Sequence, residues 1–191
     1  MVIDGPHVTP LYQQTGIPFL TVRNIVKRRI DLTEVSYISE TDHHEFTRRG
    51  KAERGDILYT KDGTMGIPCL VETDIGFSFF VSVALIKLLR DRADPRFITY
   101  ALESPAVLDQ VKQFGAGAGL KHMVLKSIRA LEVPQPPLSR QQHVAAILND
   151  QMAEAERARK TLEEQLATIN QLPAALLRRA FSGELVLVQN D

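Results

Sequence analysis

The sequence predicts an α+β fold in which a globular domain is followed by one long, coiled-coil-forming α-helix. Before residue 134 the apolar runs are short, rich in β-branched and aromatic residues, and do not alternate regularly with helical segments. After the Pro-rich stretch 134–137, one helical pattern runs almost to the end of the chain. We therefore expect a globular domain over residues 1–138 and a long helix within residues 139–191, joined by a stiff connector.

Four segments of the first part have the composition of strands, namely residues 17–22, 57–60, 67–71 and 77–88. The second and third are separated by the sequence Lys61-Asp62-Gly63-Thr64. A phosphate-binding loop of an enzyme, a loop that contacts nucleic acid and a simple hairpin turn would all have such residues. The local sequence alone leaves these three interpretations open.

A helix is predicted to begin after Asp94, with Asp94 as the N-cap and Pro95 in the first helical position. Ser104-Pro105 should interrupt this helix, and Gly115 should end it. Its inner face is predicted to consist of Phe97, Tyr100, Ala101, Val107, Leu108 and Val111.

The long helix is predicted to start at Ser139, because Ser139 and Gln142 form the pattern of a capping box. Pro173 should bend it, and Ser182-Gly183 should stop it. Apolar residues recur along it about every 3.5 residues, as in the seam of a coiled coil, with Arg159 as the one polar member. This seam consists of Leu148, Met152, Ala155, Leu162, Leu166, Ile169, Leu172 and Leu176.

A seam of this length needs a partner surface. Leaving half a dozen large apolar side chains in water forfeits roughly 1.5 to 3 kcal/mol each, a sum comparable to the stability of a whole domain. The helix could fold back onto its own globular domain, but the Pro-rich joint makes a second helix from another chain the better interpretation. We therefore expect a homodimer through the C-terminal helix.

Composition excludes several classes of protein. Hydrophobic residues make up 44% and charged residues 24%, and no apolar stretch is long enough for a membrane span. The N-terminus has no signal-peptide pattern, and the single cysteine, Cys69, lies in an apolar run where a small buried thiol is expected. These features fit a cytoplasmic protein with no membrane partner.

Charge gives little guidance, since 23 basic residues balance 23 acidic ones. Local clusters occur at residues 27–29 and 48–51, and residues 110–131 hold four basic residues and no acidic one. Such clusters are usually solvated faces, and they indicate a nucleic-acid interface only where they converge in space.

No catalytic centre, cofactor site or metal site is predicted. The glycine-rich segment Gly115–Gly119 follows a helix and leads to Lys121-His122, which fits neither a Rossmann fingerprint nor a P-loop. A nucleotide-binding enzyme that uses this segment therefore remains a remote alternative. His43 and His44, interpreted as strand residues, would point to opposite faces, and neither a nucleophile elbow nor a methyltransferase motif is present.

Residues 4–12, 16–20, 23–25 and 55–66 match, in their order and spacing, stretches of a known family. They resemble the specificity subunits of type I restriction-modification systems. The first three resemble the opening of a target recognition domain of that family, and residues 55–66 resemble its recurring hairpin. Residues 134–138 with Gln141-Gln142, and the closing residues 172–185, resemble the join and the long conserved helix of that family. Members usually carry two recognition domains and two such helices, so this chain resembles a half-subunit.

The resemblance implies sequence-specific binding of double-stranded DNA by a non-catalytic subunit. Such a subunit directs a partner methyltransferase subunit, and with it a restriction subunit, to a two-part site. A coiled-coil scaffold without DNA binding is the alternative. In the DNA-binding interpretation, the turn at residues 61–64 presents Lys61 and Thr64 to DNA, and a plain hairpin turn closed by Asp62-Gly63 remains the alternative for this segment. The full set of DNA-contact candidates is Lys27, Arg28, Arg29, Arg48, Arg49, Lys51, Lys61, Thr64, Lys121 and His122.

Overall fold

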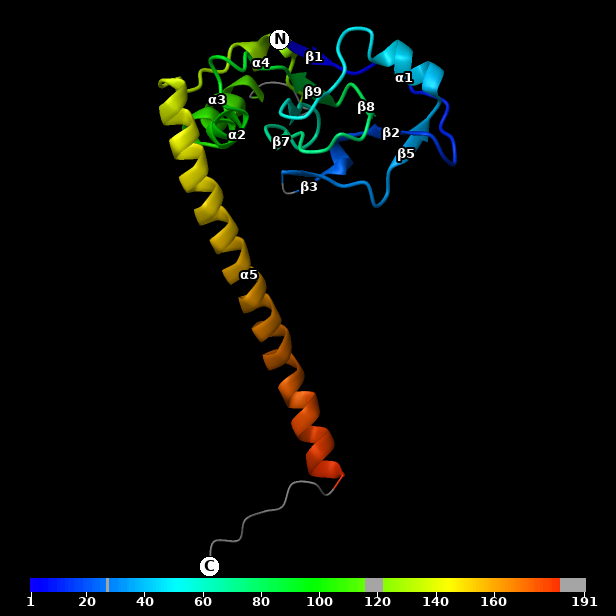
Figure 1. The fold of residues 1–191 in the computed structure, drawn as a ribbon. Coiled ribbons are helices and arrows are strands. Elements are labelled where there is room, and N and C mark those ends of the chain that lie inside the picture. The colour runs from blue at the N-terminus through cyan, green and yellow to red at the C-terminus, as the bar shows by residue number, and fades with distance from the viewer. Residues whose placement is uncertain (27, 116–121, 183–191) are drawn as a thin grey trace, which may run out of the picture. The chain divides into compact units, whose positions relative to one another are not determined.

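The computed structural model describes residues 1–26, 28–115 and 122–182, and the chain divides into two units, Met1–Ala145 and Ala146–Asp191 (Figure 1). The first unit holds the described strands and the helices α1 to α4. Helix α5 (Leu138–Phe181) begins in the first unit and continues through the second. The predicted α+β fold with a long C-terminal helix is confirmed.

The main sheet is antiparallel, with its strands in the order β1 (Val2–Asp4), β9 (Val83–Ile86), β6 (Ile57–Thr60) and β7 (Pro68–Leu70). Leu58 of the central strand β6 lies opposite Leu85 on one side and Cys69 on the other. All four residues of β6 are buried, because both faces of the sheet are covered. Burial on both faces also explains why β6 begins with an unbroken apolar run, the feature from which the strand was predicted.

Two smaller sheets hold the other described strands of the first unit. One has the order β5 (Ser36–Ile38), β2 (Ile17–Leu20) and β8 (Ser78–Phe79), with β2 and β8 parallel. The other pairs β3 (Ile25–Val26) with β4 (Arg29–Ile30), after a short 3-10 helix at Val22–Asn24.

The prediction of one strand over residues 77–88 is wrong. A turn in which the Val83 amide donates to the Phe80 carbonyl at 2.9 Å divides the segment into β8 and β9. These two strands belong to different sheets. The sequence showed no sign of this turn, because Phe80 and Val81 within it have the apolar composition of the strands on either side.

Helices α2 (Pro95–Leu102) and α3 (Pro105–Gly115) confirm the predicted start and interruption. The Asp94 carboxylate accepts a hydrogen bond from the Phe97 amide at 2.9 Å, as an N-cap does. Two shorter helices, α1 (Glu40–Phe46) and α4 (Leu125–Arg129), were not predicted. His43 and His44 therefore lie on a helix, and the interpretation of them as strand residues is wrong.

The core of the first unit consists of two clusters, one on each face of the main sheet. Ile57 and Tyr59 of β6 contribute to the cluster that includes α2, α3 and Ala145 of α5. Leu58 contributes to the other, together with Cys69 and the residues around β2 and β8. Cys69 is fully buried, as predicted, and burial raises the pKa of its thiol to about 12.

Gln141 anchors the start of α5 to the first unit. Its buried side-chain amide donates to the carbonyls of Arg92 at 3.0 Å and Pro136 at 2.8 Å, and its Oε1 accepts from the Asp94 amide at 2.9 Å. The helix begins at Leu138, so the prediction of a start at Ser139 is one residue late. Ser139 therefore lies inside the first helical turn. The side-chain hydrogen bonds at the start of the helix are made by Gln141, not by Gln142, the predicted capping partner.

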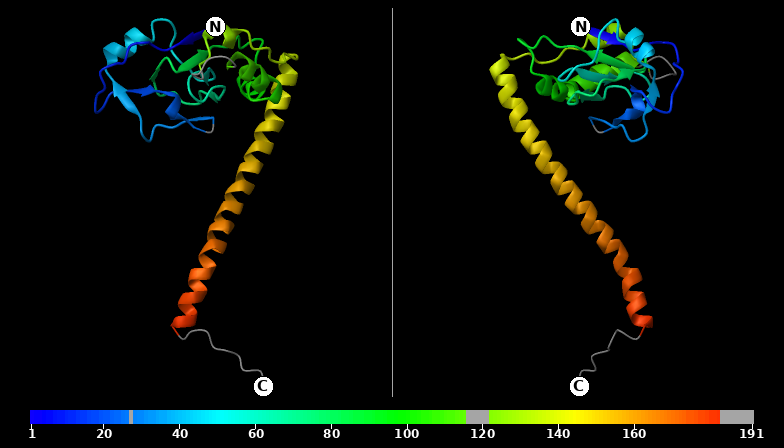
Figure 2. Two further views of the ribbon diagram at one scale, coloured as in Figure 1. Left: turned by 180° about the vertical axis from the view of Figure 1, so that it is seen from behind. Right: turned by 45° about the vertical axis from the view of Figure 1, so that its right-hand side comes forward.

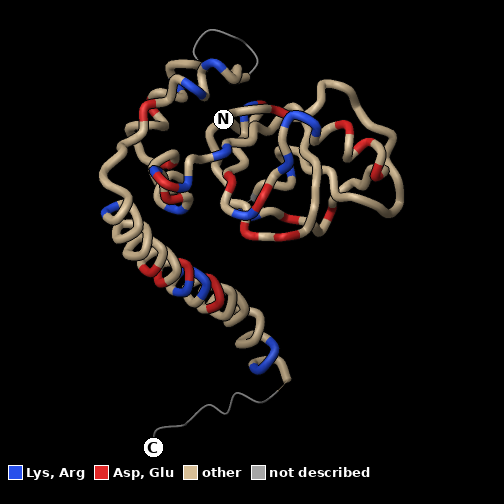
Figure 3. Tube along the Cα trace, turned by 45° about the horizontal axis from the view of Figure 1, so that its top comes forward, with Lys and Arg blue, Asp and Glu red and all other residues tan. Residues whose placement is uncertain are grey.

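In the second unit, α5 exposes the predicted seam. Leu162, Leu166, Ile169, Leu172 and Leu176 are each 50–64% exposed in the single chain. Basic and acidic residues alternate along the middle of the helix (Figure 3), where Arg159 pairs with Glu156 at 2.6 Å and also with Glu163. The helix continues through Pro173.

Among the described residues, no helix has an apolar stretch long enough to cross a bilayer.

Candidate nucleic-acid interface

The turn between β6 and β7 closes a β-hairpin, and its conformation is fixed by two glycines and by hydrogen bonds to Thr60. Gly63 and Gly66 have φ angles of +70° and +85°, which side chains other than glycine rarely adopt. The Gly66 amide donates to the Thr60 carbonyl at 2.9 Å, and the Thr60 hydroxyl accepts from the Ile67 amide at 2.9 Å. These bonds fix the positions of residues 61–66, of which Gly63 and Thr64 are exposed.

Lys61, the first residue of this turn, is buried. Its side chain is only 2% exposed, and its ammonium lies 3.5 Å from Asp62 Oδ2 and 4.0 Å from Asp4 Oδ2. The expectation that the turn presents Lys61 to a partner is therefore wrong. A buried ammonium is stable only beside opposite charges, and the two carboxylates supply them.

The two carboxylates also contact exposed arginine and histidine side chains: Asp4 contacts two of them and Asp62 one. Asp4 Oδ1 lies 3.4 Å from Arg49 Nη1, and Asp4 Oδ2 lies 3.4 Å from His7 Nε2. Asp62 Oδ1 contacts His122 Nδ1. We call these residues, from four separate segments, the Lys61 network: Asp4, His7, Arg49, Lys61, Asp62 and His122.

The backbone fixes His122 in this network. His122 and Asp62 form an antiparallel β-bridge, and the amide of the next residue, Met123, donates to the Lys61 carbonyl at 2.8 Å. The Met123 side chain is buried in the core. His122 itself is 47% exposed, so a firmly anchored residue presents its ring to the surface.

The structure brings together only some of the predicted DNA-contact residues. Arg49 and His122 belong to the Lys61 network, Thr64 lies on the same hairpin turn, and the exposed Arg48 and Lys51 flank Arg49. Lys87 donates to the Lys51 carbonyl at 2.8 Å and pairs with the buried Asp56 at 2.7 Å, which anchors this segment.

Arg28 and Arg29 lie elsewhere. They belong to the β3–β4 region, which is separate from α1 and the segment after it in Figures 1 and 2. Arg28 is held by Glu103 at 2.7 Å, whereas Arg29 is exposed. Burial raises the pKa of Glu103, although the neighbouring Arg28 opposes this shift. Arg28 thus has a structural partner that the sequence did not indicate.

Two predicted candidates, Lys27 and Lys121, lie outside the described residues, as does most of the glycine-rich segment Gly115–Gly119. Sequence reasoning also missed Asp4 and Asp62, which organise the network. Asp62 was noted only as a turn residue. Acidic residues are easily overlooked when DNA contacts are sought, because their charge opposes phosphate binding.

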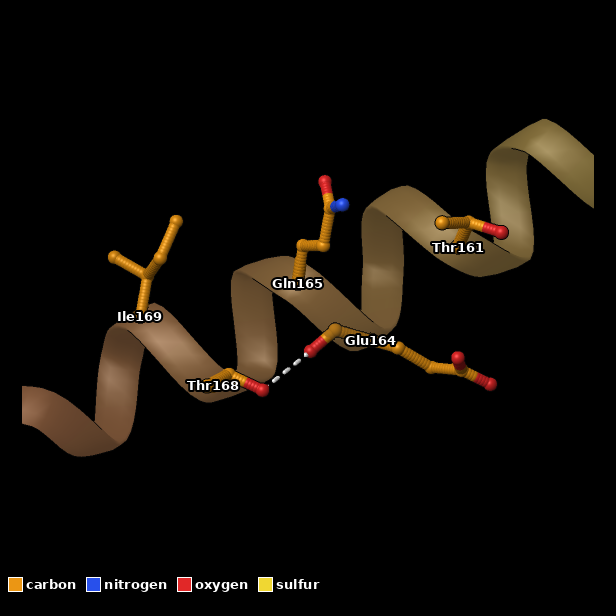
Figure 4. A pocket seen from close by; sticks show the side chains of 5 residues that line it. All are labelled: Thr161, Glu164, Gln165, Thr168 and Ile169. Atoms are coloured by element: carbon orange, nitrogen blue, oxygen red, sulfur yellow. Dashed lines mark hydrogen bonds between the residues drawn. The ribbon is translucent and has the colours of Figure 1, made fainter.

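The remaining polar features do not form a second site in the described part of the chain. His43 contacts the buried Ser78 hydroxyl at 2.8 Å, and no three His, Cys, Asp or Glu residues among those described are placed to hold a metal ion. A hollow on α5 is lined by Thr161, Glu164, Gln165, Thr168 and Ile169, all from one helix (Figure 4). It is open surface between exposed side chains, not an enclosed cavity.

Comparison with known proteins defines the class to which this fold belongs. The family model of the type I restriction modification DNA specificity domain matches residues 10–166, and the chain belongs to this family.

The curated relatives include two specificity subunits from Escherichia coli. The chain is 28% identical over 170 residues to that of the type I restriction enzyme EcoBI, covering 89% of this chain and 36% of that protein. It is 26% identical over 191 residues to that of EcoKI from strain K12, covering 95% and 40%. The chain therefore spans about two fifths of the length of these relatives.

Solved structures confirm the fold. A chain from a study of complex assembly and conformational transition of the type I R-M system gives a TM-score of 0.72 at 19% identity, covering 96% of this chain and 44% of that one. The HsdS subunit from Thermoanaerobacter tengcongensis gives 0.62 at 16% identity, covering 95% and 45%.

Proposed function

We propose that this chain is a sequence-specific DNA-binding specificity subunit, or half-subunit, of a type I restriction-modification system. Membership of the DNA specificity domain family is the observation that carries this proposal. The Lys61 network supports it, because a buried charge cluster holds exposed basic side chains from distant segments in one place. In this role Arg48, Arg49, Lys51, Thr64 and His122 contact the duplex.

The exposed seam of α5 supports pairing of two copies. Two seams of this kind bury each other as in a coiled coil and place two identical recognition domains about a two-fold axis. A symmetric pair binds an interrupted palindrome, with the spacing set by the helices. The paired subunit would direct a methyltransferase subunit, and with it a restriction subunit, to that two-part site, and the chemistry would belong to those partners.

A gel-shift titration tests DNA binding. The full chain, alone and with the methyltransferase subunit of its system, is titrated with a pool of random duplexes at several salt concentrations. We expect the affinity to fall as salt rises, with a log-log slope of about −0.9 for each phosphate contacted. A protein that serves only as a coiled-coil scaffold would shift no duplex under either condition, and that result would refute the proposal.

Charge-removal variants identify the surface. Alanine at Arg48 or Lys51, both exposed, should each reduce the salt slope by about one unit if they contact phosphates. Alanine at Arg96, an exposed arginine on α2 that pairs with Glu72 at 3.2 Å, is the matched control. Equal losses at all three positions would indicate a general charge effect rather than an interface around the Lys61 network.

A further inference from the structure

The Lys61 network can do more than display positive charge. We infer that His122 reads a base directly, with its ring nitrogen Nε2 acting as a hydrogen-bond acceptor for the exocyclic amino group of one base. In this arrangement Asp62 and the buried Lys61 are positioning residues, because they act through His122. This inference rests on the proposed function and adds a specificity-determining residue to it.

The partner of Nδ1 assigns the tautomer of His122. Asp62 Oδ1 contacts Nδ1, and a carboxylate can only accept a hydrogen bond, so Nδ1 is the donor in this contact. An imidazole that donates through Nδ1 has Nε2 as the nitrogen left to accept, which is the arrangement we infer for base reading. The amino groups of adenine, cytosine and guanine are the donors that the base edges offer in the grooves of a duplex. A ring fixed in this tautomer therefore selects for an amino group.

The position of the ring is preset as well as its tautomer. The β-bridge to Asp62 and the bond from the Met123 amide to the Lys61 carbonyl hold the backbone of His122 and of the residue after it. Lys61, 3.5 Å from Asp62 Oδ2, leaves Oδ1 available for the imidazole. A side chain held in this way loses little conformational entropy when it binds, which is what selective contacts require.

The buried Lys61 also resolves an electrostatic conflict. A bare carboxylate beside DNA repels the phosphates, yet Asp62 is needed to orient His122. The Lys61 ammonium lies 3.5 Å from Asp62 and 4.0 Å from Asp4 without reaching the surface, and together with Arg49, which pairs with Asp4, it offsets the charge of the two carboxylates. This explains why the lysine of the turn is buried beside two carboxylates rather than presented to the partner.

Site selection from random duplexes tests the inference with the full chain and its methyltransferase partner. His122→Ala should relax the preference at one base pair of each half-site and leave the others unchanged. Asp62→Ala should relax the same base pair. His143→Ala and Asp91→Ala remove the same groups from exposed positions outside the network and should select the wild-type site. Melting temperatures confirm that each variant is folded.

Base analogues that lack the exocyclic amino group test whether His122 contacts that group. At the base pair that relaxes, the base is replaced by its analogue without the amino group: purine for adenine, 2-pyrimidinone for cytosine, or hypoxanthine for guanine. The analogue should weaken wild-type binding by about 3- to 10-fold, as expected for one hydrogen bond, and should not affect His122→Ala.

The outcomes separate this inference from the proposed function. A wild-type chain that selects no site refutes the proposed function, and the inference with it. A wild-type site that His122→Ala still selects unchanged, or an analogue that weakens both proteins equally, overturns the inference alone. Uniform weakening at every base pair, with a lower salt slope, would make His122 a phosphate contact and would also overturn it.

Discussion

Two buried polar side chains, Lys61 and Gln141, connect segments of the first unit that are distant in sequence. Burying a polar group is unfavourable unless its hydrogen-bonding or charge requirements are met, and both residues meet them with partners from distant segments. Lys61 connects the N-terminal strand and the hairpin turn. Gln141 connects the long helix to the Pro-rich connector and to the start of α2.

Gln141→Ala should lower the free energy of unfolding by about 2 to 4 kcal/mol. The substitution leaves the Asp94 amide and the carbonyls of Arg92 and Pro136 without the partner they have in the buried joint. Urea denaturation followed by circular dichroism measures this loss. Gln142→Ala, at the next and exposed position, should change stability by less than about 0.5 kcal/mol. Equal effects of the two substitutions would contradict the assigned role of Gln141.

His43 should make the fold sensitive to acid. Burial lowers the pKa of His43 below its ordinary value of 6.5, and the nearby Lys51 and His44 act in the same direction. Below that value the unfolded chain binds the proton more readily than the folded one, so stability falls until the lower folded pKa is passed. His43→Gln, which can still bond to Ser78, should lose less stability between about pH 7.5 and about pH 5.5 than the wild type.

Thermal melting at the two pH values provides the measurement. His44→Gln, at the exposed neighbouring position on α1, should keep the pH dependence of the wild type. An unchanged pH dependence in His43→Gln would show that another group causes the acid sensitivity.

At the scale of single residues, sequence reasoning named Arg49, Thr64 and His122, which lie exposed in or beside the Lys61 network, but could not recognise Lys61 as buried. A lysine in a Gly-containing turn is normally solvated. Its burial depends on Asp4, which is far away in sequence and reaches it only through the pairing of β1 with β9 and of β6 with β9. Interactions of this kind are visible only after the topology is known.

The elements themselves were predicted well where composition and pattern agree. Strand β6 and the interrupted pair α2–α3 follow from apolar runs, an Asp-Pro start and a Ser-Pro break. Helix α1 was missed because it has no buried residue and hence no apolar period. Its signal was Ser39, whose hydroxyl accepts from the Asp42 amide at 3.0 Å, the N-cap bond of a Ser-x-x-Asp sequence.

The hairpin turn between β6 and β7 should respond differently to alanine at its two glycines. Gly63→Ala should cost about 1 kcal/mol, because the backbone is left-handed but space is free around the new methyl group. Gly66→Ala should cost more, since its β-carbon would lie 3.3 Å from Val111 Cγ1 in addition to the strained φ. Denaturant unfolding of the two variants checks the order, and a smaller loss for Gly66→Ala would contradict the packing described for this turn.

At the scale of the whole molecule, α5 shows a stripe that a single chain leaves exposed. The sequence predicted this stripe because its period of about 3.5 residues persists over the length of the helix. What the sequence could not show is which surface covers it.

Leu162→Glu combined with Leu166→Glu should convert a dimer into a monomer. Each leucine is more than half exposed in the single chain, and a charge in a paired seam loses its hydration. Sedimentation equilibrium gives the mass directly. Ala167→Glu introduces the same residue at an exposed position outside the seam and should leave the dimer intact. A wild-type chain that sediments as a monomer at all concentrations would contradict pairing.

Selection of bound sites from random duplexes tests the central claim most directly. The full chain, assembled with its methyltransferase subunit, is incubated with the pool, and the retained duplexes are sequenced. Paired recognition domains predict two identical half-sites in inverted orientation, separated by a spacer of fixed length and free sequence. Retained duplexes with no shared motif, or with one uninterrupted asymmetric motif, would contradict the claim that two copies of this chain read DNA together.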